Sequence, residues 1–373
     1  MSELRVLNIL GQLRPSGAEV MICNARDYWK KLSITQDILA TSDIAGVYAP
    51  EFEKAGFKVY HYPYQLSFSF YKKLYTLIKN NRYDIIHIHT ERFSFPFGIL
   101  ARIAGLKTVR SIHNCFDFTG LARIRRFLER RIIWFLGTAN IAVSDSVKEA
   151  ETRCYGNPSV SIPNWYDHNK FYPVNSTERS QIRQALAIPE KALVLITLAN
   201  CNHAKNHPEL IRALAQVKDD INFIYLHAGG EEENKEFPER QLAEELGILD
   251  RIRFLGFVDN APQLLRASDF YVMPSLFEGL GNASLEALAC GIPAILTDVA
   301  GSRDLKFIKG TFWAKPEADS LAERIREVSK LSLQEREDLG QQAHQMIKEH
   351  FGIERGVQAY ANVYQKHLVK KKK

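Results

Sequence analysis

The feature that most constrains the fold is an alternation of short runs rich in branched residues with longer amphipathic stretches. The short runs predict buried strands, and the amphipathic stretches predict helices between them. Such alternation is typical of parallel sheets with helices on both faces. The predicted strands are residues 6–10, 84–88, 108–112 and 141–143, followed by 193–198, 222–228, 252–254, 270–273 and 294–297.

The two series of strands predict two doubly wound α/β domains. The break between them falls in the proline-containing segment 164–173, and we place the boundary at residue 172. A length of 373 residues also favours two hydrophobic cores over one. Two such domains imply a central cleft between them.

Composition and charge restrict the classes of protein to which the chain can belong. The five cysteines are scattered and form no C-x-x-C pair, which favours a reducing, cytoplasmic compartment. The N-terminus lacks a signal-peptide pattern, and the most apolar stretch, 132–143, is too short to span a bilayer. Residues 1–172 hold 23 Lys and Arg against 15 Asp and Glu, a net charge of +8. That half of the chain either attracts an anionic partner or is an ordinary solvated surface.

Ligands of doubly wound sheets bind in the loops that follow the strands. Three common signatures are absent from the sequence: G-x-x-x-x-G-K-[ST], G-x-G-x-x-G after the first strand, and D-x-D. Their absence argues against P-loop hydrolysis, dinucleotide redox chemistry and a metal-bridged transfer site. The first loop, 11–19, holds the small residues Ser16 and Gly17, which let backbone N–H groups approach an anion at a helix N-terminus. The same residues also suit an ordinary turn.

The strongest local pattern is residues 273–293. A strand ends near Pro274, glycines form a turn, and Asn282 caps a predicted helix that begins at Ala283. Glu278 lies in the turn and Glu286 on the helix, and the N–H groups between them favour a diphosphate. Ionised carboxylates accept hydrogen bonds, so beside an anion they are suited to sugar hydroxyls. The alternative is that Glu278 is a solvated turn residue and that Glu286 only interacts favourably with the helix dipole.

Glu278 and Glu286, with seven residues between them, match the E-x7-E pattern of the retaining glycosyltransferases of family 4, and the chain resembles that family over nearly its whole length. It is most similar to bacterial members that build exopolysaccharide, capsule or O-antigen chains. The collinear motifs are residues 16–19, 84–89, 112–114, 142–146, 162–164, 205–207, 229–230 and 278–291.

The resemblance implies the GT-B fold, in which two Rossmann-like domains face a central cleft. Residues 1–172 would form the acceptor-side domain and 173–350 the nucleotide-sugar domain. Residues 351–373 would be a C-terminal helix that packs back toward the N-terminal domain and ends in a basic tail.

The resemblance also implies roles for single residues. Glu286 would hold the ribose hydroxyls, Glu278 would orient the transferred sugar, and Lys205 would bind the diphosphate. His113 would lie beside the donor sugar. The remaining donor contacts would come from backbone groups and small residues: Ser16, Gly17, Asn200, Gly229, Gly230, Gly279, Leu280 and Gly281.

One position departs from the family pattern. Asn200 stands where members usually carry an arginine, about five residues before the lysine. Losing a preorganised cation costs about 2–4 kcal/mol of transition-state stabilisation. Either another basic residue compensates, such as Arg110 or Arg14, or the enzyme is slow or inactive.

The implied reaction is transfer of a hexose-type sugar, with retention and without a metal or other cofactor, from a nucleotide-diphosphate donor to a glycan or lipid-linked acceptor. A UDP-sugar is favoured, and no nucleic-acid partner is expected. Two alternatives stay open: a nucleotide-sugar epimerase, and a weakly catalytic sugar-nucleotide-binding partner of another transferase.

The segment 121–135 is basic, aromatic and helical in pattern. It suits peripheral contact with an anionic membrane, or else a packed helix with an arginine-rich solvated face. The basic run 370–373 would strengthen membrane contact if it is not simply a solvated tail.

Overall fold

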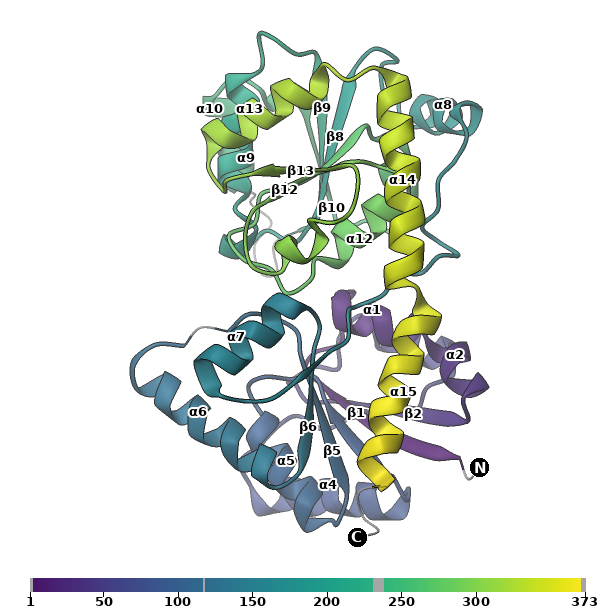
Figure 1. Ribbon diagram of the computed structural model, residues 1–373, viewed down its shortest axis with the longest axis vertical. Coiled ribbons are helices and arrows are strands. Elements are labelled where there is room, and N and C mark those ends of the chain that lie inside the picture. The colour runs from purple at the N-terminus through teal and green to yellow at the C-terminus, as the bar shows by residue number, and fades with distance from the viewer. Residues whose placement is uncertain (1–2, 117, 231–237, 370–373) are drawn as a thin grey trace. The chain divides into compact units, whose positions relative to one another are not determined.

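The computed structural model describes residues 3–116, 118–230 and 238–369. The basic run 370–373 lies outside these residues. The chain forms two compact units, one of residues 1–165 with 353–373 and one of residues 166–352 (Figure 1). The boundary therefore falls after Trp165 rather than at residue 172, because Tyr166 pairs with Gly352 in a β-bridge of the second unit.

The first unit is a seven-stranded parallel sheet in the order β3-β2-β1-β4-β5-β6-β7. Its strands are β1 (Leu4–Leu10), β2 (Ile34–Ala40), β3 (Val59–His61), β4 (Ile85–Ile88), β5 (Lys107–Ile112), β6 (Thr138–Ala142) and β7 (Val160–Ser161). Its helices are α1 (Gly17–Asn24), α2 (Arg26–Lys31), α3 (Ala49–Lys54), α4 (Phe68–Asn80), α5 (Ser94–Ile103), α6 (Gly120–Phe135), α7 (Asp145–Tyr155) and α15 (Ile353–Val369).

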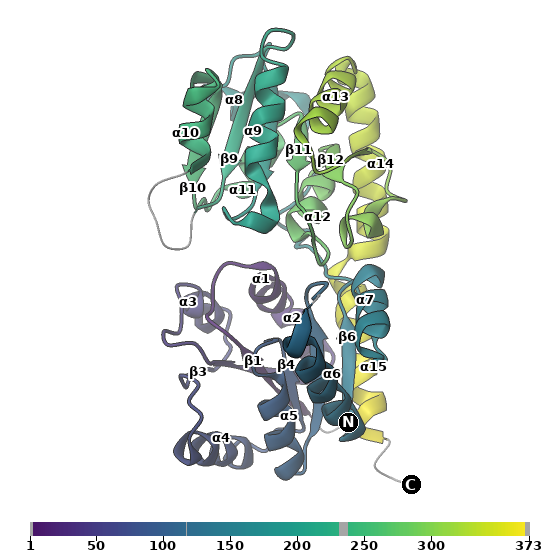
Figure 2. The ribbon, with the colours of Figure 1, turned by 90° about the vertical axis from the view of Figure 1, so that its left-hand side faces the viewer.

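Neighbouring residues of β1 point into two different cores. Val6 packs with α1, α2 and α15 on one face of the sheet, and Leu7 packs with α4 and α5 on the other. Side chains of a strand alternate between faces, so helices on both faces require strands that are apolar throughout. In Figure 2 the helices flank the sheet accordingly.

Helix α15 completes the first core although it lies at the end of the chain (yellow in Figure 1). Tyr360 and Tyr364 are buried among the side chains of that core. A Cβ on Gly356 would lie 2.2 Å from the Trp165 ring. The glycine therefore lets this ring reach the helix backbone.

The second unit is a six-stranded parallel sheet in the order β10-β9-β8-β11-β12-β13. Its strands are β8 (Leu193–Leu198), β9 (Phe223–Ala228), β10 (Ile252–Gly256), β11 (Phe270–Met273), β12 (Ala294–Thr297) and β13 (Thr311–Ala314). Its α-helices are α8 (Ser176–Ala185), α9 (His207–Gln216), α10 (Pro238–Glu245), α11 (Ala261–Ala267), α12 (Asn282–Ala289), α13 (Ala318–Ser329) and α14 (Leu333–Phe351). Its short 3-10 helices are η1 (His203–Lys205), η2 (Leu249–Arg251) and η3 (Ser302–Leu305).

Both sheets reverse their strand order, between β1 and β4 in one and between β8 and β11 in the other. Loops that leave the carboxyl ends of such strands diverge and open a crevice for ligands. The doubly wound α/β prediction is confirmed in both units. None of the helices among the described residues is long and apolar enough to cross a membrane.

Candidate active site

In the second unit the loops after β8 and β11 meet at the switch point. Leu276 N donates to Ala204 O at 2.8 Å and so ties the two loops together. Asn206 Nδ2 donates to the carbonyls of Pro274 and Pro316, each at 3.1 Å. These bonds place the Lys205 and Glu278 side chains within reach of one another.

Lys205 and Glu278 form an ion pair with 2.6 Å between Nζ and Oε1. Ser275 Oγ donates to the same carboxylate oxygen at 2.7 Å. Glu278 is buried and Lys205 is half-buried, so the pair is partly shielded from water. The arrangement joins a cation suited to a diphosphate with a carboxylate suited to sugar hydroxyls.

The turn from Glu278 to Gly281 rests on the loop after β12. A Cβ on Gly301, where φ is +85°, would lie 2.4 Å from Glu278 O. Gly279 and Leu280 are buried in this turn. The following helix α12 begins at Asn282 with Gly281 at its N-cap position. The prediction that Asn282 caps a helix from Ala283 is wrong by one residue, because Asn282 already lies within the helix.

Glu286 lies on α12 and is half-buried. Burial of its carboxyl raises the pKa to about 8, Lys170 opposes that rise, and Asp167 adds to it. In the ligand-free protein the carboxyl is therefore mostly protonated at neutral pH. Hydroxyl groups that donate to it would favour the ionised form instead.

Asn200 and the glycine pair lie at the ends of β8 and β9. A Cβ on Gly229, where φ is +135°, would lie 1.8 Å from Ala199 O, so only glycine fits there. Gly230 O accepts from Cys201 N at 3.2 Å. The Asn200 carbonyl accepts from His207 Nε2 at 3.4 Å. Asn200, Gly229 and Gly230, which the resemblance assigns to the sugar donor, thus lie at the carboxyl ends of two neighbouring strands.

Arg110 does not fit the compensating role that its charge suggested. It is 1% exposed, and its guanidinium lies 2.6 Å from Glu91 and 3.0 Å from Glu151. Arg130 joins the same two carboxylates and completes a buried cluster of two cations and two anions. Arg110 is committed to this cluster by burial and charge. Arg14 is half-buried and donates from Nε to Gln12 Oε1 at 2.8 Å.

In the first unit Ser16 and Gly17 open α1 in the loop after β1. Ser16 occupies the N-cap position, but its Oγ donates to Glu19 and accepts no hydrogen bond from the backbone N–H groups of the helix. Burial raises the pKa of Glu19. Ser16 and Gly17 thus lie at a helix N-terminus, and their contact with an anion stays a prediction.

His113 follows β5 and is half-buried. Its Nε2 lies 3.1 Å from Nδ1 of His89, which follows β4. His89 Nε2 in turn lies 3.1 Å from Oδ1 of Asn8, on β1. Burial first, and Arg110 second, lower the pKa of His113 to about 4, so its ring is neutral at pH 7.

The sequence missed several residues of these clusters. Ser275 gave no signal, because a serine after a strand is common. His89 was part of the motif at 84–89 but had no assigned role, and Asn8 was hidden inside an apolar strand. An asparagine at such a position is itself a signal, since buried polar groups need partners.

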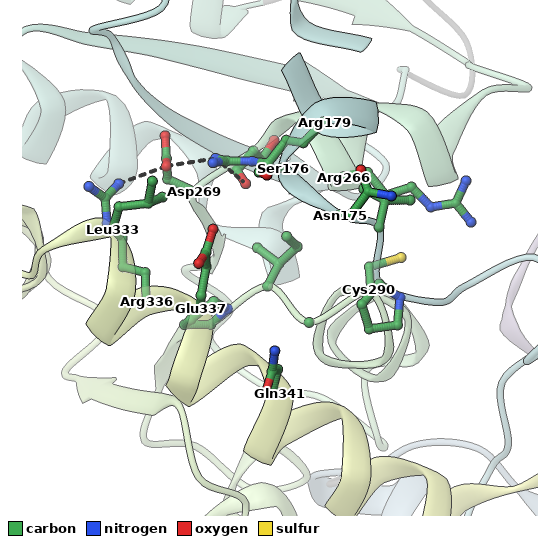
Figure 3. Close-up of a pocket in the computed structure, with 16 residues that line it drawn as sticks. Asn175, Ser176, Arg179, Arg266, Asp269, Cys290, Leu333, Arg336, Glu337 and Gln341 are labelled. Carbon is green, nitrogen blue, oxygen red and sulfur yellow. Dashed lines mark hydrogen bonds and ion pairs between the residues drawn. The ribbon is translucent and has the colours of Figure 1, made fainter. Parts of the chain in front are cut away.

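A charged cavity of the second unit lies away from these loops. It has a volume of about 210 Å³ and is lined by residues of α8, α11 and α14 (Figure 3). Asp269 precedes β11, at the opposite end of the strand from Glu278. Figure 3 shows Arg179 and Arg336 converging on it, each 2.7 Å away. These ion pairs link α8 and α14 to the start of β11.

Within the described ranges, the three-residue group that could hold a metal ion is Cys201, His207 and His227. Cys201 Sγ lies 3.7 Å from His227 Nε2. Sulfur and imidazole donors suit zinc, whereas an ion that bridges a diphosphate, such as Mg²⁺, takes oxygen ligands. This group therefore lacks the donors of a diphosphate-bridging site.

The chain is similar in sequence to bacterial proteins with glycosyltransferase names. EpsF of Bacillus subtilis strain 168, which carries such a name, is 28% identical over 312 residues, 80% of each chain. An Escherichia coli relative is 26% identical over 245 residues, 62% of each chain. It is named UDP-Gal:alpha-D-GlcNAc-diphosphoundecaprenol alpha-1,3-galactosyltransferase.

The fold is shared with solved structures of other proteins. HepE from Anabaena, solved in complex with UDP and glucose, superposes with a TM-score of 0.83. The match covers 97% of this chain and 100% of HepE, at 21% identity.

Two family models match successive parts of the chain. Residues 2–170 match Glycosyltransferase Family 4, and residues 178–346 match Glycosyl transferases group 1. Together with the two doubly wound sheets, these matches show that the chain belongs to family 4 of the glycosyltransferases and has the GT-B fold.

Proposed function

We propose that this glycosyltransferase moves a hexose-type sugar from a UDP-sugar to a glycan or lipid-linked acceptor, with retention, in the synthesis of a cell-surface polysaccharide. The observation that carries the proposal is the Lys205–Glu278 pair at the switch point of the second sheet. HepE, whose solved complex contains UDP and glucose, supports a UDP-sugar donor. The name of the Escherichia coli relative supports a lipid-linked acceptor.

In this proposal, Lys205 stabilises the charge that develops on the departing diphosphate, and Glu278 orients the transferred sugar. Glu286 accepts hydrogen bonds from the ribose hydroxyls, and His113 faces the donor sugar. The acceptor hydroxyl attacks from the face that the diphosphate leaves, and a phosphate oxygen takes its proton. Catalysis then rests on orientation and charge stabilisation.

We propose that transfer needs no Mg²⁺ or Mn²⁺. The cation at the site is the Lys205 ammonium, and the Cys201, His207 and His227 donors suit a softer metal. Equal turnover in buffer with EDTA and in buffer with Mg²⁺ or Mn²⁺ is the expected result. A strict requirement for either ion would contradict this part of the proposal.

We also propose that α6 contacts an anionic membrane. Its buried residues include Arg126 and Arg130, whereas Leu121, Leu128 and Phe135 on its outer surface are 84%, 53% and 73% exposed. Ile133 is buried beside these two arginines, so the packed face of the helix carries both arginines and an apolar residue, whereas most of its large apolar side chains are exposed. Exposed Arg123 and Arg125 add positive charge beside the apolar residues. A surface helix of this kind suits a bilayer that displays a lipid-linked acceptor.

The test begins with thermal unfolding in the presence of UDP, GDP, ADP and their hexose conjugates. A single-site ligand at 100 times its Kd adds about 2.7 kcal/mol to the free energy of unfolding. We expect UDP and one UDP-sugar to raise the Tm of the wild type and not that of Glu286→Ala. No rise with any nucleotide would contradict the donor assignment.

The second step measures products with the stabilising donor and a panel of lipid-linked acceptors. Release of UDP together with an axially linked product, identified by NMR at the anomeric proton, would support retaining transfer. Binding without UDP release would instead support the weakly catalytic alternative, which Asn200 favours because it removes one cation. An isomerised nucleotide sugar without UDP release would support an epimerase.

A further inference from the structure

A chain of buried side chains connects His113 to the interior of the first sheet. Starting from His113, it runs through His89 to Asn8, with contacts of 3.1 Å at both steps. Asn8 is 1% exposed and His89 is 9% exposed. Asn8 and His89 must therefore satisfy their hydrogen bonds within the protein.

The orientation of the Asn8 amide follows from its neighbours on β2. Its Nδ2 lies 3.4 Å from the backbone oxygen of Asp37 and 3.1 Å from Gln36 Oε1. A backbone oxygen can only accept, so the Asn8 atom that faces it must be the NH₂ group. The Oδ1 atom then faces His89 and must accept from it.

The proton positions on both rings follow in turn. Asn8 Oδ1 accepts, so His89 carries its proton on Nε2 and leaves the lone pair of Nδ1 toward His113. Burial lowers the pKa of His89 well below its usual value, and the nearby rings of His87 and His113 act in the same direction. The His89 ring is therefore neutral, with one proton only. His113 must donate to it from Nε2.

These proton positions determine the state of the other nitrogen of His113, Nδ1. A neutral ring with its proton on Nε2 has a lone pair on Nδ1. The described residues supply no hydrogen-bond partner for that atom. A second polar chain in the same unit stays separate, since His87 bonds to Tyr364 and Ser111.

We infer that Asn8, acting through His89, holds His113 as the neutral ring protonated on Nε2, so that Nδ1 accepts a hydrogen bond from a hydroxyl of the donor sugar. Asn8 and His89 are positioning residues in this arrangement. The identity of the ligand rests on the proposed function, whereas the state of the ring does not. His113 accordingly acts as an acceptor and neither as a general acid nor as a cation.

The first test reads the ring directly, in the full chain labelled with ¹⁵N-histidine. Long-range ¹H–¹⁵N spectra at pH 7 should give His113 a protonated, pyrrole-type Nε2 and an unprotonated, pyridine-type Nδ1, with the signal assigned by its loss in His113→Gln. A proton on Nδ1, or on both nitrogens, overturns the inference.

The second test uses Asn8→Leu, which removes the hydrogen-bond acceptor of His89 and keeps a side chain of similar shape. His89 is then free to move its proton to Nδ1, and the His113 signal should shift toward the other tautomer. Gln36→Leu is the matched control, because Asn8 keeps its Asp37 contact there and the His113 signal should stay unchanged. An unchanged His113 signal in folded Asn8→Leu overturns the positioning role.

Kinetic measurements test whether the His113 ring contacts the donor sugar. In Asn8→Leu we expect kcat/KM for the UDP-sugar to fall about tenfold while the Kd of UDP alone stays unchanged, since one hydrogen bond to the sugar is weakened. An equal loss of UDP affinity would mark a general structural defect and overturn the role. If the wild type turns over no donor, the proposed function fails, and the NMR measurements still decide the state of His113.

Discussion

Lys205 Nζ and Glu278 Oε1 lie 2.6 Å apart, although 73 positions separate the two residues in the sequence. Ser275 donates to the same oxygen, so Glu278 is held by two donors. The pair presents a cation and a carboxylate side by side at the end of β8 and β11.

Lys205→Ala should lower kcat for sugar transfer by about 10²–10³, the effect of removing one preorganised charge donor. The Glu278 side chain should keep its position, because Ser275 still donates to it. Steady-state release of UDP measures the effect. Lys191→Ala is the control, since Lys191 is exposed at the opposite end of β8. Equal kcat values for the two variants would exclude a role for Lys205 at the leaving group.

Nucleotide binding should release a proton from Glu286. Burial raises the pKa of this carboxyl to about 8, so the ligand-free group is mostly protonated at pH 7. Ribose hydroxyls that donate to the carboxylate lower that pKa on binding. Affinity for UDP should therefore rise with pH between 6 and 8, by up to about tenfold per pH unit.

Calorimetry in buffers of different ionisation heats measures this proton. The wild type should release close to one proton more than Glu286→Gln at pH 7, and the difference removes the nucleotide's own titration. Equal proton release by the two proteins would show that Glu286 does not titrate on binding.

Asp269→Ala should destabilise the second unit by about 2–4 kcal/mol. Asp269 is 5% exposed and accepts from three arginines and from Val194 N, and its loss leaves those donors without their acceptor. Urea unfolding followed by circular dichroism measures the change. Asp220→Ala removes an exposed ion pair and should cost less than about 1 kcal/mol. Similar losses in the two variants would mean that the Asp269 cluster contributes little.

Gly229→Ala should destabilise the protein by more than about 3 kcal/mol, because its new Cβ would overlap Ala199 O and its φ of +135° is strained for alanine. Gly247→Ala, at φ +67° with its nearest neighbour 3.6 Å away, should cost about 1–2 kcal/mol. Thermal unfolding of both variants compares them. A Gly229→Ala protein as stable as wild type would mean that the loops after β8 and β9 adjust freely.

Serine at Leu121, Leu128 and Phe135 should lower binding to phosphatidylglycerol vesicles about tenfold, because less apolar surface enters the bilayer. Co-sedimentation measures binding, and phosphatidylcholine vesicles should bind weakly throughout. Leu66→Ser with Phe68→Ser removes two side chains that are 85% and 84% exposed elsewhere in the unit, and should leave binding unchanged. If the α6 variant instead changes only the oligomeric state, the apolar face serves a second copy of the chain.

The sequence predicted the strands best where they are buried on both faces. The predicted ranges 193–198, 270–273 and 294–297 coincide with β8, β11 and β12. Strands of this kind are continuous apolar runs, so their pattern is local. Strand β2 was missed because Gln36 and Asp37 interrupt its apolar run. Both are buried, and each finds its partner far away in the sequence: Gln36 bonds to Asn8 on β1, and Asp37 bonds to Tyr83, which precedes β4.

The sequence by itself determined two doubly wound domains and the loops that hold the candidate site, because both follow from local apolar patterns and from the turns after them. Tertiary structure alone decided which of those loops meet. It paired Lys205 with Glu278, committed Arg110 to Glu91 and Glu151, and left most of the large apolar side chains of α6 exposed. These outcomes depend on the order of the strands in each sheet and on which charges become buried. Neither can be read from the local sequence around each residue.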